Sequence, residues 1–267
     1  MSPEISYLLI YLAVGCVVGF FAGLLGIGGG AVMVPILSMT FVSRGFSSDH
    51  VVHMALATSM ATIIPGALAS ARTHNKLGAV NWQILKRITP GIIAGTFGGA
   101  VIAHFSTTAF LKSFFVIFIC ALAAQMLFNL KPAAGRALPG AWGLALLGAA
   151  TGVASSFAGI GGAVITVTFL TWCNVRLHEA IGTAAALGVP LAVAGTVGFV
   201  ATGMLDKGLP AWSLGYVYLP ALVGIALTSV VIAPMGAKLA HRLPVSVLKK
   251  IFAVFLLVLA LKMAWSV

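Results

Sequence analysis

The chain has 267 residues, of which 7% are charged and 61% hydrophobic, and it carries a net charge of +11. A soluble domain carries about 25% charged residues because its surface faces water, and no soluble fold of this length could hide so much apolar surface. The composition therefore excludes a soluble protein and predicts a multi-pass integral protein of the cell (inner) membrane.

The first apolar run extends from residue 5 to residue 43 without a charged side chain. It is preceded by Glu4 rather than by the basic region of a signal peptide, so we expect a retained membrane segment. As one helix the run would be about 58 Å long, whereas the hydrocarbon core is about 30 Å thick. The run must therefore break into a long piece at about 5–25 and a short piece at about 31–42. Glycines are expected at the break, and here they are Gly26, Gly28, Gly29 and Gly30.

The same glycines fit the dinucleotide-binding fingerprint, with Asp49 at a plausible distance for a ribose ligand. That fingerprint requires a short strand before the glycines and a βαβ pattern around them. Here the glycines follow a long uncharged helix instead. We therefore interpret them as a helix break and not as a nucleotide site.

Three plainer apolar segments follow, at about 51–71, 88–105 and 111–130. The first contains Thr58 and Ser59, whose hydroxyl groups could bind a substrate oxygen or bond back to their own helix. His53, at the start of that segment, could titrate, bind an anion or simply lie at the membrane interface. Gln125, within an apolar span, is expected to bond a neighbouring helix.

The second half of the chain repeats the first. A second uncharged run covers residues 137–175 and must break in the same way, into pieces at about 140–158 and 163–174. Thr183 aligns with Thr58, and the remaining segments are expected at about 179–203, 213–234 and 245–266. The glycines at the second break are Gly159, Gly161 and Gly162.

The predicted fold is thus an all-α integral membrane protein with two related halves, residues 1–131 and 132–267. Each half has a glycine-broken helix pair and three further transmembrane helices. The short pieces reach only about 18 Å, so they are either half-helices of re-entrant hairpins or short tilted spans.

The basic residues indicate how the halves are oriented. If each broken run crosses the membrane once, the 14 basic residues before Lys262 divide equally, seven on each side. If each run crosses twice or not at all, the halves are inverted and 11 basic residues lie on one side. The four on the other side are then Arg44, Lys112, Lys207 and Lys262. The positive-inside rule favours inverted repeats, with both termini outside.

Two equivalent breaks in inverted halves are typical of the substrate site of a secondary transporter. A half-helix that begins after glycines presents free N–H groups and a positive dipole end, which bind anions. The alternative is that the glycines only allow close helix packing. The predicted substrate-binding residues are Gly26, Gly28, Gly29, Gly30, Gly159, Gly161, Gly162, Thr58, Ser59 and Thr183.

Other functions find less support in the sequence. The cysteines lie in apolar stretches without zinc-ligand spacing, and the acidic residues lie near segment ends, so no intramembrane catalytic pair is apparent. We therefore expect no enzyme activity, cofactor, metal or nucleic-acid partner. A passive anion channel is the main alternative to a transporter, since the two share pore chemistry.

Residues 15–265 resemble the sulfite exporter TauE/SafE family of membrane permeases. The resemblance lies in Ala22–Gly30 with Pro35, in Ala55–Ser59, in Gly78–Trp82, and in the second copy from Gly159 to Ala163. It implies transport of sulfur-containing anions such as sulfite or organosulfonates, usually as export. The expected partners are this small anion and the lipid bilayer, and the oligomeric state is open.

The chain departs from the family pattern, or from its own repeat, at three places. Asn81 stands where the family usually has Asp, while Thr168 and Ala184 stand where the first half has Pro35 and Ser59. The two halves are therefore not expected to make identical contacts. Family members are often described as having seven or eight spans, a number that differs from the inverted arrangement predicted here.

Overall fold

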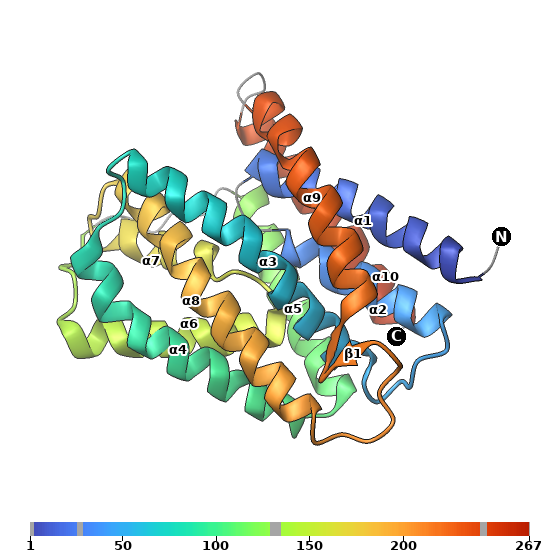
Figure 1. The fold of residues 1–267 in the computed structure, drawn as a ribbon. Coiled ribbons are helices and arrows are strands. Elements are labelled where there is room, and N and C mark those ends of the chain that lie inside the picture. The colour runs from blue at the N-terminus through green and yellow to red at the C-terminus, as the bar shows by residue number, and fades with distance from the viewer. Residues whose placement is uncertain (1–2, 26–28, 129–134, 241–244, 267) are drawn as a thin grey trace.

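The structure, a computed structural model, describes residues 3–25, 29–128, 135–240 and 245–266. In these ranges the chain forms ten α-helices and a single short β-hairpin (Figure 1). The first half contains α1 (Pro3–Leu25), α2 (Gly30–Ser43), α3 (Val51–Lys76), α4 (Trp82–His104) and α5 (Thr108–Leu127). The second contains α6 (Ala141–Ala158), α7 (Ala163–Trp172), α8 (Leu177–Gly203), α9 (Leu219–Ala240) and α10 (Val245–Ser266).

Both uncharged runs break at their glycines, as the sequence predicts. α1 ends at Leu25 and α2 begins at Gly30, while α6 ends at Ala158 and α7 begins at Ala163. Among the described residues, four helices are long and apolar enough to cross a membrane, namely α3, α5, α6 and α8. The all-α membrane fold is thus confirmed, whereas the number of spans and the inversion of the halves stay predictions.

One predicted helix begins later than expected. Residues 213–218 form β1 (Ser213–Leu214) and β2 (Val217–Tyr218), so α9 starts at Leu219 and not at 213. Gly215 at the turn has φ +54°, a conformation that glycine adopts readily and a helix does not contain. The hydrophobic pattern of this stretch therefore reflects a buried hairpin and not the first turns of a span.

The two halves are interlocked. α1 packs along α9, and the equivalent helix α6 packs along α4, while α3 packs against α8 (Figure 1). These helices approach closely because glycines leave no side chain between them: Gly91 and Gly95 of α4 lie directly on the backbone of α6 at Ala145 and Ala149. The first helix of each half is thus packed against a helix of the other half.

A cluster of polar side chains connects several segments at one end of the protein. Tyr216 in the hairpin donates a hydrogen bond to the Asp206 carboxylate and lies 3.0 Å from His104 Nδ1. His50 and His104 approach the same carboxylate at 3.7 and 3.8 Å. Burial and the bonded Asp206 carboxylate raise the pKa of Tyr216, so the hydroxyl remains a donor. The sequence gives no sign of this cluster, because its members are far apart in the chain.

Candidate functional site

The first glycine break is the turning point of a helical hairpin. The Tyr7 hydroxyl near the start of α1 donates to Ser43 O at the end of α2, at 3.1 Å. The guanidinium of Arg44 also lies 4.6 Å from the centre of the Tyr7 ring. α2 therefore returns to the end of the protein from which α1 starts.

The second break turns the chain in the same way. Arg136, shortly before α6, donates its backbone N–H to Trp172 O at the end of α7, at 3.4 Å. Its guanidinium stacks 4.3 Å from the centre of the Trp172 ring. Gln125 on α5 donates to Thr168 on α7 at 3.2 Å, which confirms the predicted bond between helices. The start and the end of each uncharged run thus lie close together in the protein.

The glycine directly before each short helix has the same backbone conformation in both halves. Gly29 precedes α2 with φ +68° and ψ −11°, and Gly162 precedes α7 with φ +65° and ψ −7°. This left-handed region is open to glycine and costs other residues about 1–2 kcal/mol. Of the other predicted glycines, Gly26 and Gly28 lie outside the described residues.

The two breaks meet in the interior of the protein. A Cβ atom added to Gly30 would overlap the carbonyl oxygen of Gly159 and lie 3.2 Å from Cα of Ile160. The same carbonyl oxygen accepts a 2.8 Å hydrogen bond from the buried Ser59 hydroxyl of α3. A Cβ on Gly161, in contrast, would meet only the tip of Ile63 at 3.8 Å. The structure therefore brings Ser59 and the glycines of both halves to one junction.

Thr58 and Thr183 lie elsewhere. Thr58 Oγ1 accepts the backbone N–H of Tyr218 at 3.0 Å, and Thr183 Oγ1 accepts that of Asn81 at 2.9 Å. Each hydroxyl thereby holds the segment that precedes a helix of the other half. The structure does not bring either residue to the glycine junction, and a direct role in binding the anion stays a prediction.

Asn81 links the start of α4 to the start of α8. Its side-chain oxygen caps α4 by accepting the N–H groups of Gln83 and Ile84, at 3.0 and 3.1 Å. Its side-chain amide donates to the carboxylate of Glu179 in the first turn of α8. An aspartate could cap the helix equally well but could not donate to Glu179.

Asn81→Asp is therefore expected to destabilise the protein by about 2 kcal/mol, because a hydrogen bond is replaced by two facing carboxylates. Thermal unfolding of the purified variant measures the loss. Adding Glu179→Gln should restore most of it, since the glutamine amide can donate to the new carboxylate. Equal stability of Asn81→Asp and wild type would show that Asn81 and Glu179 do not interact.

Two residues near the second break were not identified from the sequence. Ser155 and Thr151 of α6 are each 1% exposed, and a Cβ on Gly162 would lie 3.0 Å from Ser155 Oγ and 3.1 Å from Thr151 Cγ2. Neither hydroxyl oxygen has a hydrogen-bond partner among the described residues. The repeat alignment could not reveal them, because the first half has apolar residues at the equivalent positions.

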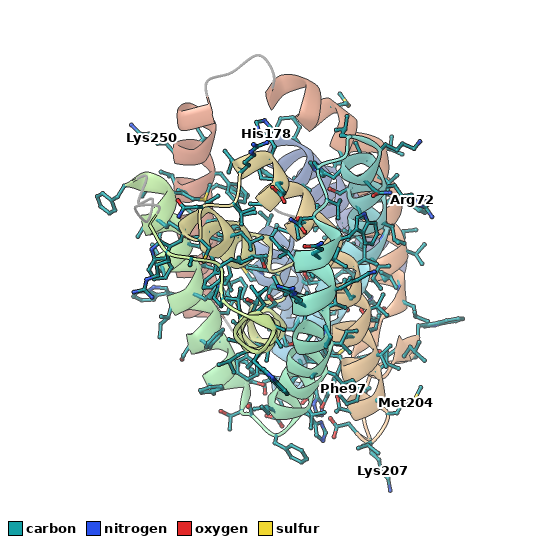
Figure 2. The ribbon with its side chains drawn as sticks, turned by 90° about the vertical axis from the view of Figure 1, so that its left-hand side faces the viewer. Arg72, Phe97, His178, Met204, Lys207 and Lys250 are labelled. Carbon is teal, nitrogen blue, oxygen red and sulfur yellow. The ribbon has the colours of Figure 1, made fainter. Side chains whose placement is uncertain are left out.

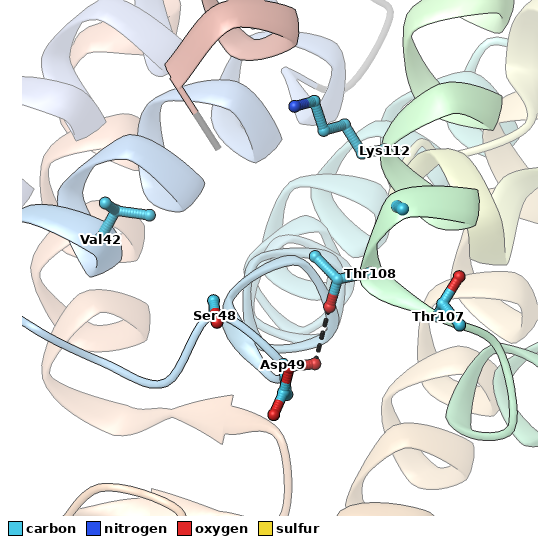
Figure 3. A pocket seen from close by; sticks show the side chains of 7 residues that line it. Val42, Ser48, Asp49, Thr107, Thr108 and Lys112 are labelled. Atoms are coloured by element: carbon cyan, nitrogen blue, oxygen red, sulfur yellow. Dashed lines mark hydrogen bonds between the residues drawn. The ribbon is translucent and has the colours of Figure 1, made fainter.

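A pocket of about 460 Å³ lies away from this junction (Figure 3), and its residue Asp49 directly precedes His50, which lies 3.7 Å from the Asp206 carboxylate. Its wall includes Asp49 and Thr108, joined by a 2.7 Å bond from the Thr108 hydroxyl to Asp49 O, and Lys112 of α5. None of the predicted substrate-binding residues lines this pocket. It is therefore not the site that the glycine breaks predict.

Comparison with known proteins gives one family and several relatives. The profile of the family described as sulfite exporter TauE/SafE matches residues 11–263. A probable membrane transporter protein of Haemophilus influenzae is 37% identical over 97% of this chain and 98% of its own. Another, of Methanocaldococcus jannaschii, is 27% identical over 90% of both chains. A third, of Bacillus subtilis, is 28% identical over 93% of this chain and 96% of its own.

Proposed function

The chain belongs to the sulfite exporter TauE/SafE family of membrane transporters, and we propose that it is a secondary transporter that exports small sulfur-containing anions such as sulfite or organosulfonates. The observation that supports this most is the contact between the two glycine breaks, one from each half, at the buried residues Gly30 and Gly159. Half-helices that begin at such a junction direct N–H groups and positive dipole ends toward a common region. An oxyanion is the ligand that suits this arrangement.

We also propose that the two halves are inverted in the membrane. The hairpins α1–α2 and α6–α7 each return to their starting side, which leaves an odd number of crossings in each half. Figure 2 supports the charge distribution that this requires, with Arg72 and Lys250 toward one end of the protein and Lys207 at the opposite end. By the positive-inside rule, the end with Arg72 is cytoplasmic.

Labelling of single cysteines tests this orientation. In a chain whose native cysteines are replaced, Arg72→Cys should react only with an impermeant reagent applied from the cytoplasm. Lys207→Cys should react only from outside. Both side chains are exposed, so access and not burial decides the result. Cytoplasmic labelling at position 207 would contradict the inverted arrangement.

The membrane potential is sufficient to drive export. Asp49 and Asp206 lie in loops and Glu179 in the first turn of α8, so these carboxylates are not placed as a relay inside the membrane. An anion that leaves a cell with an inside-negative potential gains about 2.3 kcal/mol per charge per 100 mV. A carrier that exports anions therefore needs no proton relay.

Flux in proteoliposomes tests the proposed function. Labelled sulfite, methanesulfonate, sulfate and acetate are compared at a fixed pH gradient, with the potential either set by a potassium gradient or collapsed. We expect saturable flux of sulfite or the sulfonate that falls when the potential is collapsed. Flux that rises linearly with concentration would indicate a channel, and the absence of flux for all four anions would contradict the proposal.

A further inference from the structure

The two glycine breaks have the same backbone but different surroundings. The nearest residues of α1 to Gly29 are Val18 and Ala22, eleven and seven positions before it. The residues of α6 at the same distances from Gly162 are Thr151 and Ser155. The repeat thus places two apolar side chains beside the first break and two hydroxyl-bearing side chains beside the second, with Ser155 Oγ and the Thr151 methyl group near Gly162.

The hydroxyl groups of Thr151 and Ser155 lack the partners that neighbouring hydroxyls have. Ser156, the next residue, donates to Thr96 O at 2.8 Å, and Thr166 on α7 donates to Gly162 O at 3.1 Å. Thr151 Oγ1 and Ser155 Oγ are buried without a partner in the described part of the chain. Buried hydroxyl groups are normally satisfied, so an unpartnered pair points to something that binds between them.

The starts of the two short helices also differ in packing. Residues 30–35 at the start of α2 are all buried, and Gly30 packs directly on the Gly159 carbonyl. At the start of α7, residues 163–165 are only half-buried. The backbone N–H of Thr166 donates to Gly162 O. The N–H groups that precede it in α7 have no acceptor within their helix. The start of α7 is therefore less closely covered by protein than that of α2.

We propose that the chain binds its anion at one break only, at the start of α7, where the hydroxyls of Ser155 and Thr151 donate to the anion together with the first backbone N–H groups of the helix. This inference rests on the proposed function and specifies its site. The donors are neutral and come from two helices, α6 and α7, which suits several oxygens on one sulfur atom. The first break is a packed junction that supports the second.

Substitutions on α6 test this assignment in the purified full-length protein. The variants are Ser155→Ala and Thr151→Val, with Ser156→Ala as the matched control whose hydroxyl already has a protein partner. Sulfite and methanesulfonate are the probes, at constant ionic strength, and anion-dependent thermal stabilisation reports binding without turnover. We expect each of the first two changes to weaken binding about tenfold, and the double variant more, because a bond to a charged ligand is lost.

The control and the flux measurement separate the possible outcomes. Ser156→Ala should unfold at a lower temperature but keep the wild-type affinity for the anion. A double variant that folds and retains wild-type affinity, while wild type transports sulfite or the sulfonate, would overturn this inference and leave the proposed function standing. Wild-type protein that neither binds nor transports these anions would overturn both.

Discussion

Gly30→Ala is expected to abolish most of the folded protein, although it adds a single methyl group. The Cβ would overlap the Gly159 carbonyl oxygen and press on Cα of Ile160, and both are backbone atoms that cannot rotate away. Overpacking of a well-packed interior costs about 1–3 kcal/mol even where side chains can adjust. A backbone contact between two helix breaks has no such freedom, so we expect a loss of more than about 3 kcal/mol.

Gly161→Ala provides the matched control, two residues after Gly159 on the other side of the same junction. Its Cβ would make only an ordinary contact with Ile63 at 3.8 Å, and Gly161 does not have a positive φ. Detergent extraction followed by size-exclusion chromatography measures the yield of monodisperse protein for both variants. Wild-type yield and thermal stability of Gly30→Ala would show that the two breaks do not pack together as described.

The sequence predicted the helix breaks because they follow from length alone. An uncharged run of about 58 Å cannot remain one straight span in a core of about 30 Å, whatever its neighbours are. The same argument says nothing about which helices become neighbours. The packing of α1 on α9 and the contact of Gly30 with Gly159 depend on long-range assembly, which no local pattern encodes.

The alignment of the two halves showed which residues are equivalent but not where they lie in the folded protein. It paired Thr58 with Thr183 correctly as two hydroxyls with one role, since each accepts a backbone N–H from the other half. It could not show these hydrogen bonds, because they join segments that are far apart in the chain. It also could not show Ser155, because that hydroxyl has no counterpart in the first half, where Ala22 occupies the equivalent place. An alignment of the two halves therefore cannot identify a functional residue that occurs in only one of them.

Substitution of Gly162 is expected to have the largest effect on anion binding, and Gly29 offers an unusually close control. Alanine at either position must adopt a φ near +65°, at a similar cost of about 1–2 kcal/mol. Either Cβ would also press on a side-chain methyl group, Leu191 Cδ1 at 2.7 Å or Val18 Cγ1 at 2.6 Å. The two variants should therefore lose similar amounts of stability in the absence of anion.

The two variants should differ in how strongly they bind the anion. The Cβ at position 162 would stand 3.0 Å from Ser155 Oγ, in the space where the hydroxyl and the first amides of α7 converge, whereas that at position 29 meets Val18 and Ala22. We expect Gly162→Ala to weaken the binding of sulfite or methanesulfonate at least a hundredfold and Gly29→Ala to leave it within about threefold of wild type, since only the first loses several donors at once. Thermal stabilisation by the anion, measured against each variant's own unfolding temperature, separates this effect from strain. Equal losses in both variants would mean that the two breaks contribute symmetrically, and the site would then belong to the junction as a whole and not to α7.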